Sequence, residues 1–340
     1  MDVLSAISIF FVIVLHSTLT VFDYRQELSW FVSLVLQTLF IWPVPIFFMI
    51  TGANLLNYRE RYTTKVYAKK RFKRIIIPLI FWSLISFLYS SLVNHKSLWD
   101  PYSFLKGLVY NKIQNNYWFF YTMIVVYCCI PVLTVFANKK YKRLVEYLLC
   151  IVLLTEGVLP TVFLIVNKPY PWYLVNPMFS HYLGYVVLGW YLNTFDLSSK
   201  KRQLLYISSV LSFMVMFFGT IYLSASNHQM NRSLFGYSTI FVYILASAVF
   251  VFAKNHPLHL GMDSKRHKLI MFISSSTLGI YASHRIVMSI CEHLITFPID
   301  SFGYIFLMPI LCFLGTICLV WGLKRFPIIK SAVYFFRIFE

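Results

Sequence analysis

Ten long apolar stretches run through the sequence, and they decide what the chain can fold into. They lie near residues 3–22, 30–56, 75–93, 117–137, 144–166, 179–195, 203–223, 234–253, 269–290 and 302–323. A helix needs about 20 apolar residues to cross a bilayer. Only 12% of the 340 residues are charged, against about 25% in a soluble domain, so a soluble fold would leave large apolar patches in water. The sequence therefore predicts an all-α, polytopic integral membrane protein with about ten transmembrane helices, forming one domain over residues 1–340.

Positive charge falls in every second loop between these stretches. Of the 30 lysines and arginines, 23 lie in alternate loops and the C-terminal tail, six lie in the intervening loops, and Arg285 lies inside the ninth stretch. Loops that stay in the cytoplasm carry the excess of lysine and arginine. The alternation predicts cytoplasmic termini and an even number of spans. It also accounts for the net charge of +18 without the nucleic-acid partner that a basic surface would otherwise suggest.

Local features refine this topology. The second stretch contains Pro43 and Pro45, so we expect a kink or an irregular helix start there. The segment from Tyr102 to Ile113 is amphipathic and is expected to lie on the membrane surface. The first stretch has no basic leader before it and is expected to remain as a span. The six cysteines show neither metal-ligand spacing nor a disulfide framework, so we expect buried cysteines and no metal site.

Ionisable residues inside the apolar stretches are few. They are His16, Glu156, His284, Arg285 and Glu292, with His181 at the outer edge of the sixth stretch. A charge near the bilayer centre costs at least about 2.5–3.5 kcal/mol on insertion scales, so such residues tend to be functional. His16 and His284 each lie 14 residues beyond the cytoplasmic start of their helix, or roughly 21 Å along its axis. We therefore expect two imidazoles at one level of the membrane.

Imidazole is suited to proton transfer. Histidine titrates near neutrality and can take a proton from a hydroxyl and return it, which makes His16 and His284 candidate catalytic residues. The alternative is that each histidine only hydrogen-bonds a neighbouring helix. Glu156 and Glu292 could orient an imidazole, although pairing with Arg285 is an equally good expectation.

The loop after the second stretch is unusually basic. Eight lysines and arginines lie between Arg59 and Arg74, and they lead into the third stretch, which carries Trp82. Arg71 and Arg74 are three residues apart, which places them on one face of a helix. Because guanidinium groups match phosphate oxygens, Arg71, Lys73 and Arg74 could hold the phosphates of a nucleotide-like donor. The alternative is a patch that sets the topology and binds lipid headgroups.

Five short motifs occur in order along the chain. They are Asp2-Val3-Leu4-Ser5 with His16 eleven residues after Ser5, Pro45-Ile46-Phe47-Phe48-Met49-Ile50-Thr51-Gly52, Lys70-Arg71-Phe72-Lys73-Arg74-Ile75-Ile76-Ile77-Pro78, Trp118-Phe119 with Tyr127 and Pro131, and Ser276-Thr277-Leu278-Gly279-Ile280-Tyr281-Ala282-Ser283-His284. Together they resemble the acyltransferase-three family of membrane O-acyltransferases, particularly its bacterial O-acetyltransferases of surface polysaccharides. The resemblance extends from residue 2 to about residue 325.

The resemblance implies an O-acetyltransferase of the bacterial cytoplasmic (inner) membrane. Such an enzyme moves acetyl from cytoplasmic acetyl-CoA, its co-substrate, to a hydroxyl of a cell-surface polysaccharide such as the O-antigen of lipopolysaccharide. The partners implied are the acyl-CoA donor, a glycan or lipid-linked glycan acceptor and the lipid bilayer, with no bound cofactor. The catalytic role falls on His16, with His284 beside it, and donor use falls on Arg71 and Arg74. Supporting roles are expected for Ser5, Thr51, Gly52, Trp82, Tyr281 and Glu156.

The chain departs from the family pattern at Ser5, where the family has an arginine. Serine supplies neither a fixed positive charge nor a guanidinium fork. Either a nearby cation such as Arg71 or Arg74 takes over, or donor binding is weaker, or activity is compromised. Thr51 replaces the usual serine and keeps the hydroxyl.

Two functions of other classes compete with acyl transfer. A transporter or export component for a polysaccharide or small solute also uses about ten spans and ionisable residues near the midplane. The absence of a visible inverted repeat and the cytoplasmic position of the basic loop argue against it. The other is a non-catalytic membrane assembly factor, which Ser5 in place of the family arginine favours.

Overall fold

The computed structural model describes residues 1–95, 97–98, 100–176, 179–258, 264–295 and 297–326, and within them every regular element is a helix. The helices are α1 (Asp2–Ser17), α2 (Leu28–Leu39), α3 (Pro43–Leu55), α4 (Thr64–Val93), α5 (Pro101–Val109), α6 (Trp118–Leu133), α7 (Lys142–Leu153), α8 (Leu159–Ile165), α9 (His181–Thr194), α10 (Ser199–Asn227), α11 (Ile240–Asn255), α12 (Lys265–Leu294) and α13 (Phe302–Leu323). Lys96, Lys330 and Arg337, which count among the loop cations, lie outside the described residues.

The helices agree in position with the apolar stretches of the sequence. Each of the ten stretches falls on a helical segment. Among the described residues, seven segments are long and apolar enough to cross a membrane: Leu28–Glu60, Thr64–Val93, Asn115–Leu133, Lys139–Ile165, Ser199–Asn227, Ser233–Asn255 and Phe302–Leu323. The other three stretches correspond to α1, α9 and α12, of which α1 has 16 residues and α9 has 14. The protein is therefore all-helical and polytopic, while the count of ten and the cytoplasmic termini stay predictions.

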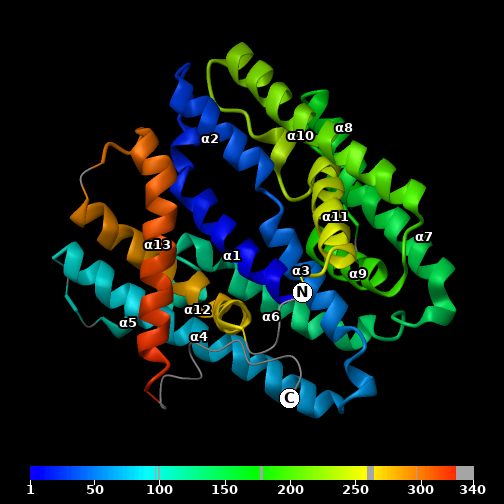
Figure 1. Ribbon diagram of the computed structural model, residues 1–340, viewed down its shortest axis with the longest axis horizontal. Coiled ribbons are helices and arrows are strands. Elements are labelled where there is room, and N and C mark those ends of the chain that lie inside the picture. Colours follow the sequence, from blue (N-terminus) through cyan, green and yellow to red (C-terminus); the bar gives the residue numbers. More distant parts are fainter. Residues whose placement is uncertain (96, 99, 177–178, 259–263, 296, 327–340) are drawn as a thin grey trace.

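One local expectation is confirmed, and a second is confirmed only as far as a helix forms, while its place on the membrane surface stays a prediction. The second stretch is broken, because α2 ends at Leu39 and α3 begins at Pro43, where proline suits the first helical turn. The amphipathic segment forms α5, with Asp100 accepting a hydrogen bond from the Ser103 amide at 3.0 Å. This short helix lies at the side of the bundle (Figure 1).

The expectation of buried cysteines was wrong for most of them. All six are free, and only Cys312 is buried. The exposed ones, Cys128, Cys150 and Cys318, lie on the outward faces of α6, α7 and α13. In a membrane protein the outward face of a helix is apolar, so a small apolar side chain is as acceptable there as in the core.

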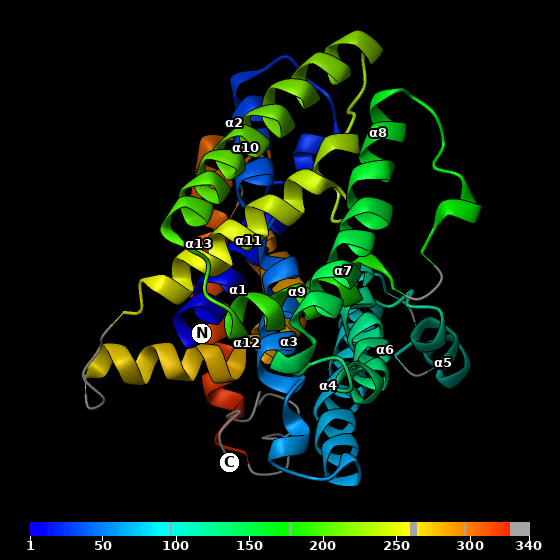
Figure 2. The ribbon, with the colours of Figure 1, turned by 90° about the vertical axis from the view of Figure 1, so that its right-hand side faces the viewer.

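The centre of the bundle is α1, which packs against α3, α12 and α13. Figures 1 and 2 show α1 enclosed by these helices, with α10 and α11 on one side and α4 to α6 on another. Next to it, α3 and α9 cross at close range. A Cβ on Gly52 would lie 1.8 Å from the Val186 carbonyl oxygen, and one on Gly189 would lie 2.2 Å from the Met49 carbonyl oxygen. Small residues at such crossings let two backbones approach.

Candidate active site

Two histidines meet where α1 and α12 pack together. His16 lies in the last turn of α1, and His284 lies in the C-terminal half of α12. Their ring centroids are 4.8 Å apart and the ring planes are inclined by 45°. His284 is fully buried, whereas His16 is partly exposed and faces a cavity. The structure thus brings together the two imidazoles that the sequence places at one level.

Hydrogen bonding fixes the position of the proton on a neutral His284 ring. Its Nδ1 lies 2.5 Å from the Tyr281 carbonyl oxygen, which can only accept. Nδ1 therefore carries the proton, and Nε2 is an acceptor. Among the described residues, this buried Nε2 has no hydrogen-bond partner. Leaving a buried acceptor without a partner costs about 1–3 kcal/mol, so Nε2 is set up to accept from His16 or from a substrate.

His16 lines an outer cavity of about 430 Å³. This volume is typical of small-molecule sites. Most of the wall is aromatic or aliphatic, with Phe22, Trp118, Tyr182 and Tyr237 among its residues. The wall is shaped by the end of α1, where the Gln37 amide donates to the Leu15 carbonyl oxygen at 2.6 Å and to the Thr18 hydroxyl at 2.8 Å.

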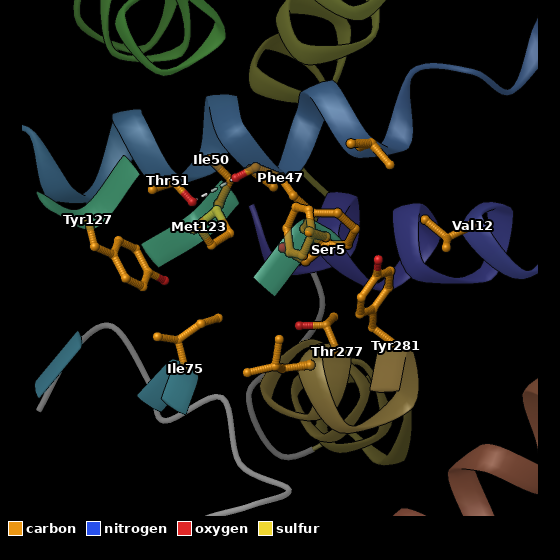
Figure 3. Close-up of a pocket in the computed structure, with 13 residues that line it drawn as sticks. Ser5, Val12, Phe47, Ile50, Thr51, Ile75, Met123, Tyr127, Thr277 and Tyr281 are labelled. Atoms are coloured by element: carbon orange, nitrogen blue, oxygen red, sulfur yellow. Dashed lines mark hydrogen bonds between the residues drawn. The ribbon is translucent and has the colours of Figure 1, made fainter. Parts of the chain in front are cut away.

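A second, narrower cavity of about 40 Å³ continues from the outer one toward α4. Residues from α1, α3, α4, α6 and α12 line it (Figure 3). Ser5, Thr51, Ile75 and Tyr127 belong to this inner cavity alone, whereas Val12, Val44 and Tyr281 line both cavities. The two cavities therefore meet one helical turn from His16. In Figure 3, Thr51, Ile75 and Tyr127 lie at the end far from Val12 and Tyr281.

The basic motif lies at that far end. Arg71 and Arg74 are buried on α4, and Arg74 directly precedes Ile75 of the inner cavity. The Arg71 guanidinium donates to the Tyr62 hydroxyl at 3.1 Å. Lys73 is exposed on another face of the same helix. Neither arginine lines either cavity, but both are buried on α4 beside Ile75, which does line the inner one, whereas Lys73 is exposed.

The supporting residues divide into cavity walls and packing contacts. Ser5 and Thr51 line the inner cavity, and the Thr51 hydroxyl donates to the Phe47 carbonyl oxygen at 2.8 Å. Gly52 is the small residue of the α3–α9 crossing. Trp82 is buried, and its carbonyl oxygen accepts from the Tyr117 hydroxyl at 3.3 Å.

Sequence reasoning missed two residues beside the histidines, Asn116 and Tyr117. The Tyr117 hydroxyl bridges α4 and α12, at 2.8 Å from the Ser86 hydroxyl and 2.9 Å from the Ala282 carbonyl oxygen. The Tyr281 hydroxyl donates to the Asn116 carbonyl oxygen. The buried Asn116 side-chain amide has no hydrogen-bond partner among the described residues. The available signal was their position directly before the Trp118-Phe119 motif.

The membrane carboxylates lie elsewhere. Glu156, in the π-helical turn Leu154–Val158, accepts from the Asn176 amide at 3.1 Å. Glu292 accepts from the Tyr304 hydroxyl at 2.6 Å. The Arg285 guanidinium lies 3.4 Å from the Met288 sulfur, and the ion pairs within the described residues do not include it. Neither carboxylate lines the cavities at the imidazoles.

His181 lies beside the outer cavity without lining it. Its ring centroid is 3.9 Å from that of Tyr182, which does line the cavity. The His181 carbonyl oxygen accepts from the Tyr243 hydroxyl at 3.0 Å. The ring thus supports one of the cavity's aromatic walls.

Comparison with known proteins identifies the family. The model of the third acyltransferase family, which is described as an acyltransferase domain, matches residues 1–324. No curated protein and no solved structure matches the chain. The match covers the helices of both cavities, both histidines and the basic motif. The chain therefore belongs to the acyltransferase-three family of membrane O-acyltransferases.

Proposed function

We propose that this protein transfers an acetyl group from acetyl-CoA to a hydroxyl of a cell-surface glycan in the bacterial cytoplasmic membrane. The acceptor is a polysaccharide such as O-antigen, or its lipid-linked precursor. Acetyl-CoA binds from the side of Arg71 and Arg74, and the acceptor binds in the outer cavity. Thus the two substrates approach the imidazoles from opposite sides of the membrane.

One observation supports this proposal: His16 lines the outer cavity one turn from its junction with the inner cavity, and the inner cavity extends to Ile75, which follows the buried Arg74 on α4. The donor is long and thin at its thioester arm, whereas a sugar is compact. A narrow inner cavity and a wide outer one suit that pair of substrates.

The reaction needs one base and one carbonyl. His16 takes the proton of the sugar hydroxyl while the oxygen attacks the thioester carbonyl carbon. The tetrahedral intermediate collapses as the carbon–sulfur bond breaks, and the leaving thiolate takes the proton back from the imidazolium. The products are an acetyl ester and CoA. When the substrates bind, the unpartnered His284 Nε2 accepts a hydrogen bond from His16 and so positions the base. A route through an acyl-enzyme uses the same groups in two steps.

The first prediction tests the base. His16→Ala should lower acetylation by about 10²–10⁴-fold at equal expression, because general base catalysis contributes that much. The measurement is mass spectrometry of surface glycans, in which each acetyl ester adds about 42 Da; loss of polymer without a mass change would favour transport. His293→Ala is the matched control, since His293 is exposed on the same helix as His284. Unchanged acetylation in His16→Ala would remove His16 from the mechanism.

The second prediction tests donor binding. Arg71→Ala and Arg74→Ala should each raise the KM for acetyl-CoA by about tenfold or more, because hydrogen bonds to charged groups contribute about 1.5–3 kcal/mol. Lys73→Ala should have a smaller effect, since Lys73 is exposed. Lys69→Ala is the control, a cation exposed on the same helix. Kinetics in membrane vesicles with acetyl-CoA decide the question, and equal KM values for all four variants would refute the assignment.

A further inference from the structure

The outer cavity carries a positive charge at its rim. Arg232 lines this cavity together with His16. It lies between α10 and α11, directly before the short helical turn Ser233–Phe235. Its guanidinium carbon lies 5.6 Å from the ring centroid of Phe22, another residue of the cavity wall. The side chain thus lies against the wall with its charge at the rim.

The loop that carries Arg232 is held by side chains on both sides of it. The Asn231 amide donates to the Ser224 hydroxyl at 3.0 Å, and the Ser233 amide donates to the Asn231 side-chain oxygen at 3.1 Å. These bonds tie the loop to the end of α10. The backbone at Arg232 is therefore placed beside the cavity, and the exposed side chain lies against Phe22 of the wall.

This charge is not compensated by the cavity. Among the residues that the structure describes, no acidic one lines it. The ion pairs found within the described residues join Arg25 to Asp300, Lys142 to Glu146 and Lys254 to Asp196, and leave Arg232 without a carboxylate partner. A positive group beside a low-dielectric wall attracts anions more strongly than one in open water. The guanidinium fork also matches the oxygens of a carboxylate or phosphate.

The rest of the wall suits the apolar face of a sugar ring. The Trp118 ring centroid lies 5.6 Å from that of Tyr182 and 6.1 Å from that of Tyr237, with ring planes inclined by 32° and 35°. All three residues line the cavity. Aromatic walls with a few placed polar groups are typical of small-ligand sites. The cavity therefore combines an aromatic platform, one cation at its rim and an imidazole at its inner end.

We infer that the acceptor is anionic: a carboxylate or phosphate group of the acceptor binds Arg232, and this contact directs a sugar hydroxyl to His16. The inference rests on the proposed function for the identity of the acceptor as a sugar. The negative group has two sources, an acidic sugar in the glycan or the diphosphate of a lipid-linked glycan.

Direct binding tests the inference without acyl transfer. The purified protein in phosphatidylcholine nanodiscs is titrated in a calorimeter with three probes. The first probe is neutral cellobiose. The second is a disaccharide of glucuronic acid and glucose, and the third is cellobiose linked to a short polyprenyl diphosphate. Wild-type protein should bind at least one anionic probe about tenfold or more tightly than cellobiose. Preference for the glucuronate probe identifies an acidic sugar, and preference for the diphosphate probe alone identifies a lipid-linked acceptor.

Variants of Arg232 complete the test. Arg232→Gln should abolish the preference for the anionic probe, and Arg232→Lys should retain most of it. Lys168→Gln is the control, because Lys168 is exposed in the loop after α8, at the same end of the bundle as the loop after α10 (Figure 2). A size-exclusion profile checks that each variant is folded. Equal binding of all probes, no binding of the anionic probes, or a preference that survives Arg232→Gln would overturn the inference. Because no acetyl group moves, failure here is distinct from failure of the His16→Ala prediction.

Discussion

The two imidazoles of the candidate site have different surroundings, and the proposed function gives them different roles for that reason. The Nδ1–H of His284 is held by the Tyr281 carbonyl oxygen, which leaves only the buried Nε2 to act. His16 lies at the cavity, where it can meet a substrate hydroxyl. In the proposed reaction, His16 is therefore the base and His284 is a positioning residue.

The third prediction separates the two nitrogens of His284. A glutamine amide reaches the position of Nε2, whereas an asparagine amide reaches only that of Nδ1. His284→Gln should therefore retain more activity than His284→Asn, with kcat falling about tenfold in the first and about 10²-fold or more in the second. The KM for acetyl-CoA should stay within about twofold of wild type in both, since neither change touches the donor site. Initial rates in vesicles measure both constants.

A purely structural role for His284 gives a different result. If the ring only holds α12 through the Tyr281 carbonyl oxygen, His284→Asn keeps that hydrogen bond and should be the more active variant. The order of the two kcat values thus decides between positioning and packing, and a thermal melt of each variant shows whether stability has changed.

At the scale of residues, the sequence could predict only those features of the site that depend on spacing along a single helix. The equal heights of His16 and His284 and the shared face of Arg71 and Arg74 follow from helical geometry alone. The hydrogen bond from Tyr281 to Asn116 joins residues 165 positions apart. No periodicity within one helix encodes such a contact, so Asn116 was missed.

At the scale of elements, the tightest packing at a glycine among the described residues is where α3 and α9 cross. A methyl group on Gly52 or Gly189 would meet the backbone of the other helix rather than a flexible side chain. Since backbone cannot rotate away, any larger residue must separate the helices. The crossing lies behind the cavity wall, because Phe47, Ile50 and Thr51 of α3 line the inner cavity.

The fourth prediction follows from this crossing. Gly52→Ala should destabilise the protein by about 1–3 kcal/mol, the usual cost of overpacking a tight contact. Gly322→Ala is the matched control, because a Cβ there meets nothing within 4 Å. The control should be neutral or slightly stabilising, since alanine favours a helix over glycine by about 0.5–1 kcal/mol. Thermal unfolding in detergent measures both, and equal melting temperatures would contradict the packing role of Gly52.

The sequence predicted elements better than their pairing. Pro43 and the apolar runs indicated where helices break and extend, because these are properties of a local segment. That Gly52 packs on Val186 requires knowing that α9 lies beside α3, which is a tertiary fact. The same limit applies to Glu156, whose partner Asn176 lies across the loop after α8.

At the scale of the whole molecule, the loop charges predict that α9 crosses the membrane, whereas its length is short for a membrane span. The charge alternation requires α9 to cross the membrane, because Lys168 precedes it on the predicted outer side and Lys200 follows it on the predicted cytoplasmic side. Yet α9 has 14 residues, or roughly 21 Å of helix, against a hydrocarbon core of about 30 Å. We expect α9 to cross nonetheless, because it packs against α3 and a helix buried in protein need not match the lipid thickness itself.

The fifth prediction tests this expectation, and with it the even number of spans. In a variant with the six native cysteines replaced by alanine, Lys168→Cys should react with a membrane-impermeant maleimide in intact cells, whereas Lys200→Cys should react only after the membrane is opened. Lys69→Cys, in the basic segment, serves as the cytoplasmic reference. Labelling of positions 168 and 200 from the same side would mean that α9 returns without crossing. The termini would then lie on opposite sides of the membrane.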